Sequence, residues 1–157
     1  SLFLRRVQRW RRPLGYLAAA TLASVLLVSS LKQVSNLDCP WDLQDYGGSE
    51  PYYGLFDDRP DDLPRARCFP GGHSSSAFAW FGLYFLARSR GQRRAALMIL
   101  PPLLVGTLFA AGQWTRGAHF PSHDLTTAYL CWMVACALQQ LLYPRLPRRA
   151  GVRRAVK

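Results

Sequence analysis

Four stretches of the chain consist mainly of apolar residues, and each is close in length to one crossing of a membrane. They cover residues 14–31, 71–87, 95–111 and 125–143. A helix that crosses the hydrocarbon core of a bilayer needs about 17 to 25 residues. We therefore predict an all-α fold, a polytopic transmembrane helical bundle with four spans, in which residues 1–157 form a single membrane domain.

The charged residues between these stretches are sorted by sign. Fifteen of the 20 Lys and Arg residues lie in three segments, residues 5–12, 88–94 and 145–157. The nine Asp and Glu residues lie in residues 38–62, apart from Asp124. If the four helices alternate across a membrane, the basic segments share one side and the acid-containing connections share the other, which is the positive-inside pattern. We therefore expect cytoplasmic termini and an outer loop at residues 32–70.

The net charge of +11 initially suggests a nucleic-acid-binding protein. However, the basic residues are divided among short segments beside apolar stretches, and membrane topology explains this placement better. We expect no nucleic-acid partner; a soluble helical bundle with charges segregated by chance is the weaker alternative. The basic tail, residues 144–157, is expected in the cytoplasm, either solvated or in contact with anionic lipids.

The four cysteines form two pairs along the chain. Cys39 and Cys68 lie in the predicted outer loop, where an oxidising compartment would allow a disulfide between them. Two free, partly buried thiols are the alternative. Cys131 and Cys136 lie inside the last apolar stretch, and we interpret them as packing residues.

The candidate catalytic groups gather at the outer ends of the predicted helices. All three histidines of the chain lie there: His73, His119 and His123. One imidazole could attack a phosphorus atom, and another could protonate the departing oxygen. Gly71 and Gly72 open the second apolar stretch, where free backbone N–H groups favour an anion.

Charged side chains at the same face could complete a phosphate site. Lys32 and Arg116 could neutralise phosphate oxygens, and Asp124 could orient an imidazole as a carboxylate does in acid–base triads. Taken singly, a Lys at a helix end more often reaches for the membrane surface, and an Arg there usually serves topology. The joint placement at the ends of three consecutive helices favours the functional interpretation.

Over about residues 14–143, the sequence resembles the type 2 phosphatidic acid phosphatase superfamily. The family has three motifs: Lys, six residues, Arg-Pro; Pro-Ser-Gly-His; and Ser-Arg, five residues, His, three residues, Asp. The matching stretches, in the same order, are Lys32 to Cys39-Pro40, Pro70 to His73, and Gln113 to His119 followed by His123 and Asp124. Four positions depart from the pattern: Cys39, Gly71, Gln113 and His123 stand where the family has Arg, Ser, Arg and Asp. The stretch from Arg116 to Asp124 resembles a variant in a bacterial branch of the superfamily, so we interpret the departures as a subtype.

The resemblance implies roles for individual residues. His119 would be the nucleophile that forms a phosphohistidine, His73 would be the general acid, and either His123 or Asp124 would orient His119. The groups that would hold the phosphoryl oxygens are Lys32, the Gly71 and Gly72 amides, and Arg116 or Arg67 in place of the missing arginines. The resemblance requires no cofactor and no metal, and the sequence offers no convincing set of metal ligands.

The resemblance also implies a function and a location. The expected protein is a lipid phosphate or diphosphate phosphatase of the bacterial inner membrane, with its active site at the periplasmic face. Undecaprenyl diphosphate, phosphatidylglycerophosphate and lipid A are candidate substrates, and the sequence does not choose among them or predict an oligomeric state. The alternatives are a lipid phosphotransferase that uses the same histidines and a catalytically inactive relative that binds lipid headgroups.

Two further expectations concern the length of the chain and its outer loop. The family usually has six spans, so a chain with four that begins at Ser1 is expected to lack two N-terminal spans. The aromatic residues of the outer loop could cover the headgroup site, or the loop could pack without contacting substrate.

Overall fold

The computed structural model describes residues 2–143 of the 157-residue chain, and every regular element in this part is helical. The α-helices are α1 (Leu2–Val34), α2 (Gly72–Phe78), α3 (Gly82–Ser89), α4 (Leu100–Thr115) and α5 (Pro121–Leu142). Short 3₁₀ turns are η1 (Pro40–Asp42), η2 (Gln44–Tyr46), η3 (Ala79–Phe81) and η4 (Ala95–Ile99). The expected basic tail, residues 144–157, lies outside the described residues.

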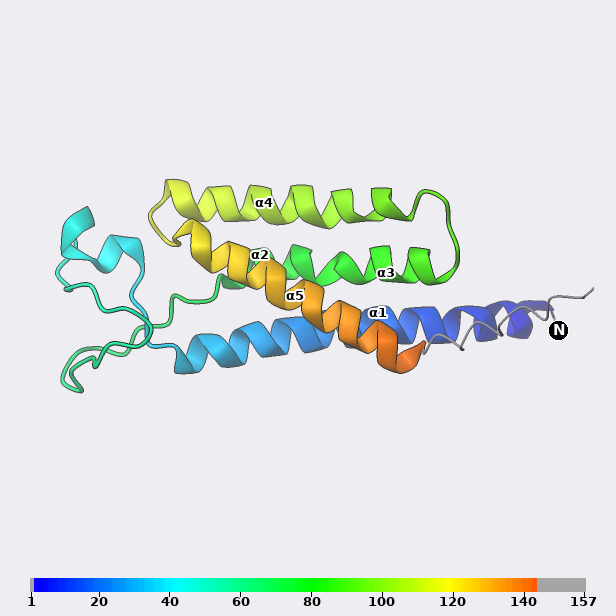
Figure 1. Cartoon of the computed structure of the whole chain (residues 1–157), viewed down its shortest axis with the longest axis horizontal. Helices are drawn as coiled ribbons and strands as arrows, with labels where there is room; N and C mark the ends of the chain where they lie inside the picture. The colour runs from blue at the N-terminus through cyan, green and yellow to red at the C-terminus, as the bar shows by residue number, and fades with distance from the viewer. Residues whose placement is uncertain (1, 144–157) are drawn as a thin grey trace, which may run out of the picture.

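The chain reverses direction between α1 and α2, between α3 and α4, and between α4 and α5, whereas α2 and α3 follow one line (Figure 1). The connection between α1 and α2, residues 35–71, corresponds to the predicted outer loop and projects from one end of the bundle, where α4 also turns into α5. Residues 5–12 and 88–94 lie at the opposite end, where the guanidinium of Arg90 lies 5.0 Å from the centre of the Trp10 ring. The fold therefore separates these basic segments from the acidic loop along the bundle axis.

Among residues 2–143, three helices are long and apolar enough to cross a membrane: Trp10–Val34, Ala95–Thr115 and Pro121–Leu142. They contain nearly all of three predicted spans, and the predicted helical membrane bundle is confirmed as the fold class. The stretch predicted as a span at residues 71–87 is instead a line of three pieces, α2, η3 and α3. Its first turns are polar, and the hydroxyls of Ser75 and Ser76 donate to carbonyls three residues earlier, which is a pattern that bends helices.

The core is a narrow stripe where α1, α3 and α5 meet. Tyr16, Ala20, Ser24 and Val28 are buried on α1 at four-residue spacing, which places them on one face of the helix. The Tyr16 hydroxyl donates to the backbone oxygen of Ala135 over 2.9 Å. The four leucines of α4 are exposed instead, as are Leu14, Leu22 and Leu26 of α1, which fits helix faces that contact lipid rather than protein.

Helices α2 and α4 approach closely at Gly106. A Cβ atom at this glycine would lie 2.2 Å from Cε1 of Phe78, whereas one at Gly112 on the same helix would meet nothing within 4 Å. We expect Gly106→Ala to lower the free energy of unfolding by about 1 to 3 kcal/mol because the added methyl overpacks the contact. Thermal unfolding in detergent, with Gly112→Ala as the matched control, measures this. Equal melting temperatures would contradict the close approach.

Candidate active site

The first turn of α5 and the connection before it bring a histidine and a carboxylate together. His119 Nδ1 lies 3.3 Å from each carboxylate oxygen of Asp124. The two residues are 5% and 2% exposed. Because an ionised carboxylate only accepts hydrogen bonds, Nδ1 is the nitrogen that carries the proton. In the neutral imidazole, the Nε2 atom of His119 then keeps its lone pair and can act as a nucleophile.

Two further donors hold the Asp124 carboxylate. Ser74 Oγ on α2 donates to Oδ1 over 2.6 Å, and Trp114 Nε1 on α4 donates to Oδ2 over 2.8 Å. Together with His119, these hydrogen bonds favour the ionised carboxylate and fix its orientation. Sequence reasoning missed both residues as members of the site. The available signal was their position, since Ser74 follows His73 and Trp114 follows Gln113.

The two residues considered for orienting His119 have different surroundings. Asp124 makes the contact with its Nδ1 atom. The ring centre of His123 lies 5.9 Å from that of His119, and the His123 ring meets Phe69 and Phe120 edge to face. The geometry therefore favours Asp124 for the orienting role, although His123 occupies the position of the family's aspartate.

The backbone at Gly71 passes directly beside this pair. A Cβ atom at Gly71 would lie 2.3 Å from Asp124 Oδ1 and 3.2 Å from His119 Nδ1. The Gly71 N–H donates to the His123 carbonyl over 3.1 Å, and the hydroxyl of Thr127 donates to the Gly71 carbonyl over 2.8 Å. Two departures from the motifs thus fit each other, because a side chain at Gly71, where the family motif has serine, would overlap the Asp124 carboxylate.

The predicted phosphate-binding cations differ in their surroundings. Lys32, in the last turn of α1, donates to the Cys68 carbonyl over 3.4 Å, and its Nζ would lie 3.8 Å from a Cβ atom at Gly72. Arg116 follows α4, and its guanidinium lies 5.3 Å from the ring centre of Trp41. Arg67 is exposed. Within residues 2–143, no cluster of three His, Cys, Asp or Glu side chains is placed to hold a metal ion.

A cavity of about 430 Å³ opens beside the histidines. It is lined by Gly72, His73, Ser76, Leu108, Phe109, Gly112, Gln113 and Arg116, whereas Arg67 does not line it. The ring centre of His73 lies 6.2 Å from that of His119, so this exposed histidine connects the cavity with the buried pair. Arg116 is the charged residue of the lining, so the cavity can receive an anion.

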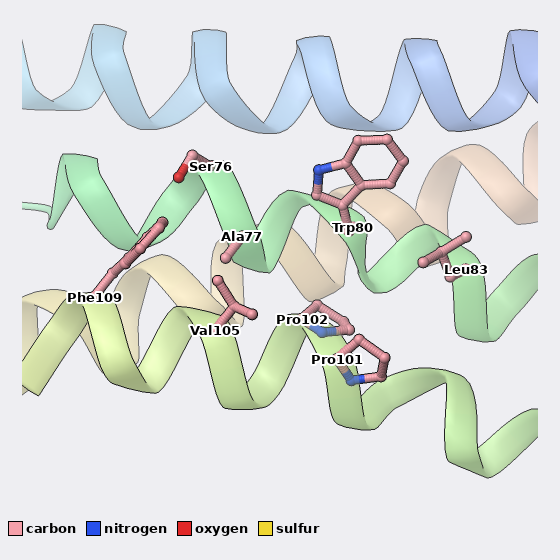
Figure 2. A pocket seen from close by; sticks show the side chains of 8 residues that line it. All are labelled: Ser76, Ala77, Trp80, Leu83, Pro101, Pro102, Val105 and Phe109. Carbon is pink, nitrogen blue, oxygen red and sulfur yellow. The ribbon is translucent and has the colours of Figure 1, made fainter.

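The cavity beside His73 and Arg116 adjoins an apolar cavity. This second cavity, about 300 Å³, lies between α2–α3 and α4 and shares Ser76 and Phe109 with the first. Figure 2 shows its side chains coming from two facing segments, with Pro101 and Pro102 at the start of α4. The two cavities are therefore neighbours, one beside His73 and Arg116 and the other an apolar groove between helices.

The outer loop is tied to this centre. Cys39 and Cys68 form a disulfide with a Cα–Cα distance of 5.1 Å across 29 residues of sequence. The Trp41 N–H donates to the Gly117 carbonyl over 2.9 Å, which places Trp41 beneath Arg116. Cys39, at the position of the family's arginine, therefore links the loop to the segment before α2 instead of supplying a cation.

Comparison with known proteins identifies the family. A family model described as the PAP2 superfamily matches residues 13–146, which include every candidate site residue. Neither the curated proteins nor the solved structures give a match. Proteins of this superfamily are generally phosphatases, which supports a phosphoesterase activity for this membrane protein. Because the match covers most of the chain and agrees with the motif resemblance, the chain belongs to the PAP2 superfamily.

Proposed function

We propose that this protein hydrolyses a lipid phosphate or diphosphate through a phosphohistidine on His119. The observation that carries the proposal is that the Asp124-held histidine lies beside the cavity lined by His73 and Arg116, which adjoins the apolar groove. This arrangement suits a molecule with a phosphate at one end and a hydrocarbon chain at the other.

The residues support a two-step reaction. His119 Nε2 attacks phosphorus, the bond from phosphorus to the leaving oxygen breaks, and His73 gives that oxygen a proton. Water then attacks the phosphohistidine, His73 takes the proton from this water, and the Nε2–phosphorus bond breaks to release phosphate. Arg116, Lys32 and the N–H groups near Gly72 stabilise the negative oxygens during both steps.

The proposed substrate is defined by its chemical class, a phosphate joined to a hydrocarbon chain. Undecaprenyl diphosphate, phosphatidylglycerophosphate and lipid A all combine a phosphate with a hydrocarbon chain, and we propose one of them for a site at the periplasmic face of a bacterial inner membrane. An inactive, headgroup-binding relative is the weaker alternative. Two of the motif departures that suggested it, Gly71 and the shifted carboxylate of Asp124, fit each other in the structure.

The test is phosphate release by the purified full chain in detergent, measured on a panel of lipid phosphates. We expect release from at least one lipid and little from a water-soluble phosphate monoester, because the apolar groove contributes binding only for a chain. Adding an acceptor lipid separates hydrolysis from phosphotransfer. Lipid binding without release or transfer would overturn the proposal in favour of the inactive relative.

The proposed periplasmic face depends on the orientation of the bundle. A reporter fused to Lys157 is expected to lie in the cytoplasm, because the basic segments that flank the predicted spans favour that side. An alkaline phosphatase fusion, which is active only outside the cytoplasm, is the matched measurement. High alkaline phosphatase activity would place the histidines on the cytoplasmic side.

Gly71 offers a sharp test of the fit between the motif departures. We expect Gly71→Ala to lower kcat by about 100-fold, since its methyl group must displace the carboxylate that orients His119. Gly15→Ala is the control, because a Cβ atom at Gly15 would meet nothing within 4 Å. Both variants are assayed on the same lipid phosphate. A normal rate in Gly71→Ala would show that the carboxylate has room to move.

A further inference from the structure

A separate cavity of about 490 Å³ lies between the outer loop and the first turn of α5. Five aromatic rings line it: Tyr46, Tyr52, Tyr53, Phe69 and Phe120. Two carboxylates, those of Asp38 and Asp45, are also part of its lining, and none of the described residues that line it is Lys or Arg. Its chemistry is therefore opposite to that of the cavity beside Arg116.

The charges around this cavity select against a phosphate. Asp38 is paired with Arg59, while Asp45 has no ion pair among the described residues. The outer loop carries eight acidic residues and three arginines between positions 35 and 71. A concave surface with this balance concentrates cations and repels anions.

His123 supplies a second, independent sign of a ligand. It is 5% exposed, it lines the cavity, and its Nδ1 atom has no hydrogen-bond partner in the described part of the chain. Buried polar atoms in proteins nearly always have a partner, so this atom is available for a hydrogen bond to a molecule in the cavity. Neutral imidazole offers one nitrogen as an acceptor and the other as a donor.

We propose that this cavity binds an organic ammonium group, such as the quaternary ammonium of choline. The faces of Tyr46 and Tyr52 would attract the ammonium group through cation–π interactions, and the Asp45 carboxylate would balance its charge. The ring of Tyr53 already has the Arg59 guanidinium 5.8 Å from its centre, so it contributes shape rather than a free face. Phe120 follows His119 in the chain, so the amine site borders the pair formed by His119 and Asp124. The amine belongs either to the headgroup of the phosphate-bearing lipid or to a separate molecule.

The direct test is binding of choline to the purified, disulfide-intact chain in detergent, measured by calorimetry. The control ligand is 3,3-dimethyl-1-butanol, which has the shape of choline without its charge. We expect choline to bind at least about tenfold more tightly, since cation–π attraction needs the charge. Equal binding of both ligands, or no binding of choline, would overturn the proposal.

Variants locate the site. Asp45→Asn and Tyr52→Ala are each expected to weaken choline binding about tenfold through the lost charge or ring face. Tyr129→Ala is the matched control, because Tyr129 is similarly exposed but lies on α5 outside this cavity. Unchanged binding in both test variants, with melting temperatures equal to that of the control, would contradict the assignment.

Two further experiments follow. One separates this proposal from the proposed catalysis, and the other distinguishes the two sources of the amine. Binding is repeated in His119→Ala, where it is expected to persist, so a failure of the phosphatase proposal leaves this one measurable. The KM of Asp45→Asn is then compared for lipid phosphates with and without a headgroup amine. A KM raised only for the amine-bearing lipid supports a substrate headgroup, and unchanged KM values with weakened choline binding support a separate amine.

Discussion

His119→Ala is expected to abolish phosphate release from every lipid phosphate that the protein hydrolyses. The imidazole is the group that forms the bond to phosphorus, and its Nε2 lone pair is preserved because Nδ1 donates to Asp124. Removing a nucleophile of this kind costs about 1,000-fold or more in kcat. Initial rates of phosphate release in detergent, on the best lipid of the panel, measure the loss.

The matched control for this variant is Thr107→Ala, an exposed position in the middle of α4 that lines neither cavity of the proposed substrate site. Both variants are expected to insert into the membrane and to melt at similar temperatures. Added imidazole can occupy the space left by the missing ring, and partial rescue by it would support the nucleophile assignment. A His119→Ala rate within tenfold of the unaltered protein would remove the assignment.

Asp124→Asn is expected to have the second largest effect, a fall in kcat of about 100- to 10,000-fold. The asparagine amide can donate to Nδ1, so the imidazole would carry its proton on Nε2 and lose the lone pair that attacks phosphorus. KM should change little because Asp124 is buried behind the histidine and does not line the substrate cavity. The measurement is a full rate curve against lipid concentration, which separates kcat from KM.

Two neighbouring variants make this expectation specific. Trp114→Phe removes one of the donors to the carboxylate but keeps the carboxylate itself, so a fall in kcat of only about tenfold is expected. His123→Asn removes the residue at the family's aspartate position. If His123→Asn lowered kcat more than Asp124→Asn does, the orienting role would belong to His123.

The bundle architecture followed from the sequence because it depends on properties that add up along the chain. Apolar stretches of span length and the segregation of charge between them are enough to predict helices that alternate across a membrane. The stretch at residues 71–87 was less predictable, since its polar first turns compete with an unbroken helix and its interruption at η3 depends on packing.

The composition of the site was also partly predictable. The placement of His73, His119 and Lys32 at one end of the helices, together with the spacing of the family motifs, predicted them as site residues, because both are read along the chain. Ser74, Trp114 and Thr127 were not predicted as site residues, and each makes its hydrogen bond to a residue on another element or loop. Such partners become neighbours only when the helices pack.

The sequence by itself determined the membrane bundle, the side of the bundle that carries the histidines, and the family. The tertiary structure decided between His123 and Asp124 as the contact of His119, because adjacent residues on a helix point about 100° apart and only the packing of α2 and α4 selects one. It also decided the pairing of Cys39 with Cys68, whose Cα atoms approach to 5.1 Å only when the outer loop folds back. Contacts between segments that are distant in the sequence form only when the helices and the loop pack together, so inspection of the sequence alone does not identify them.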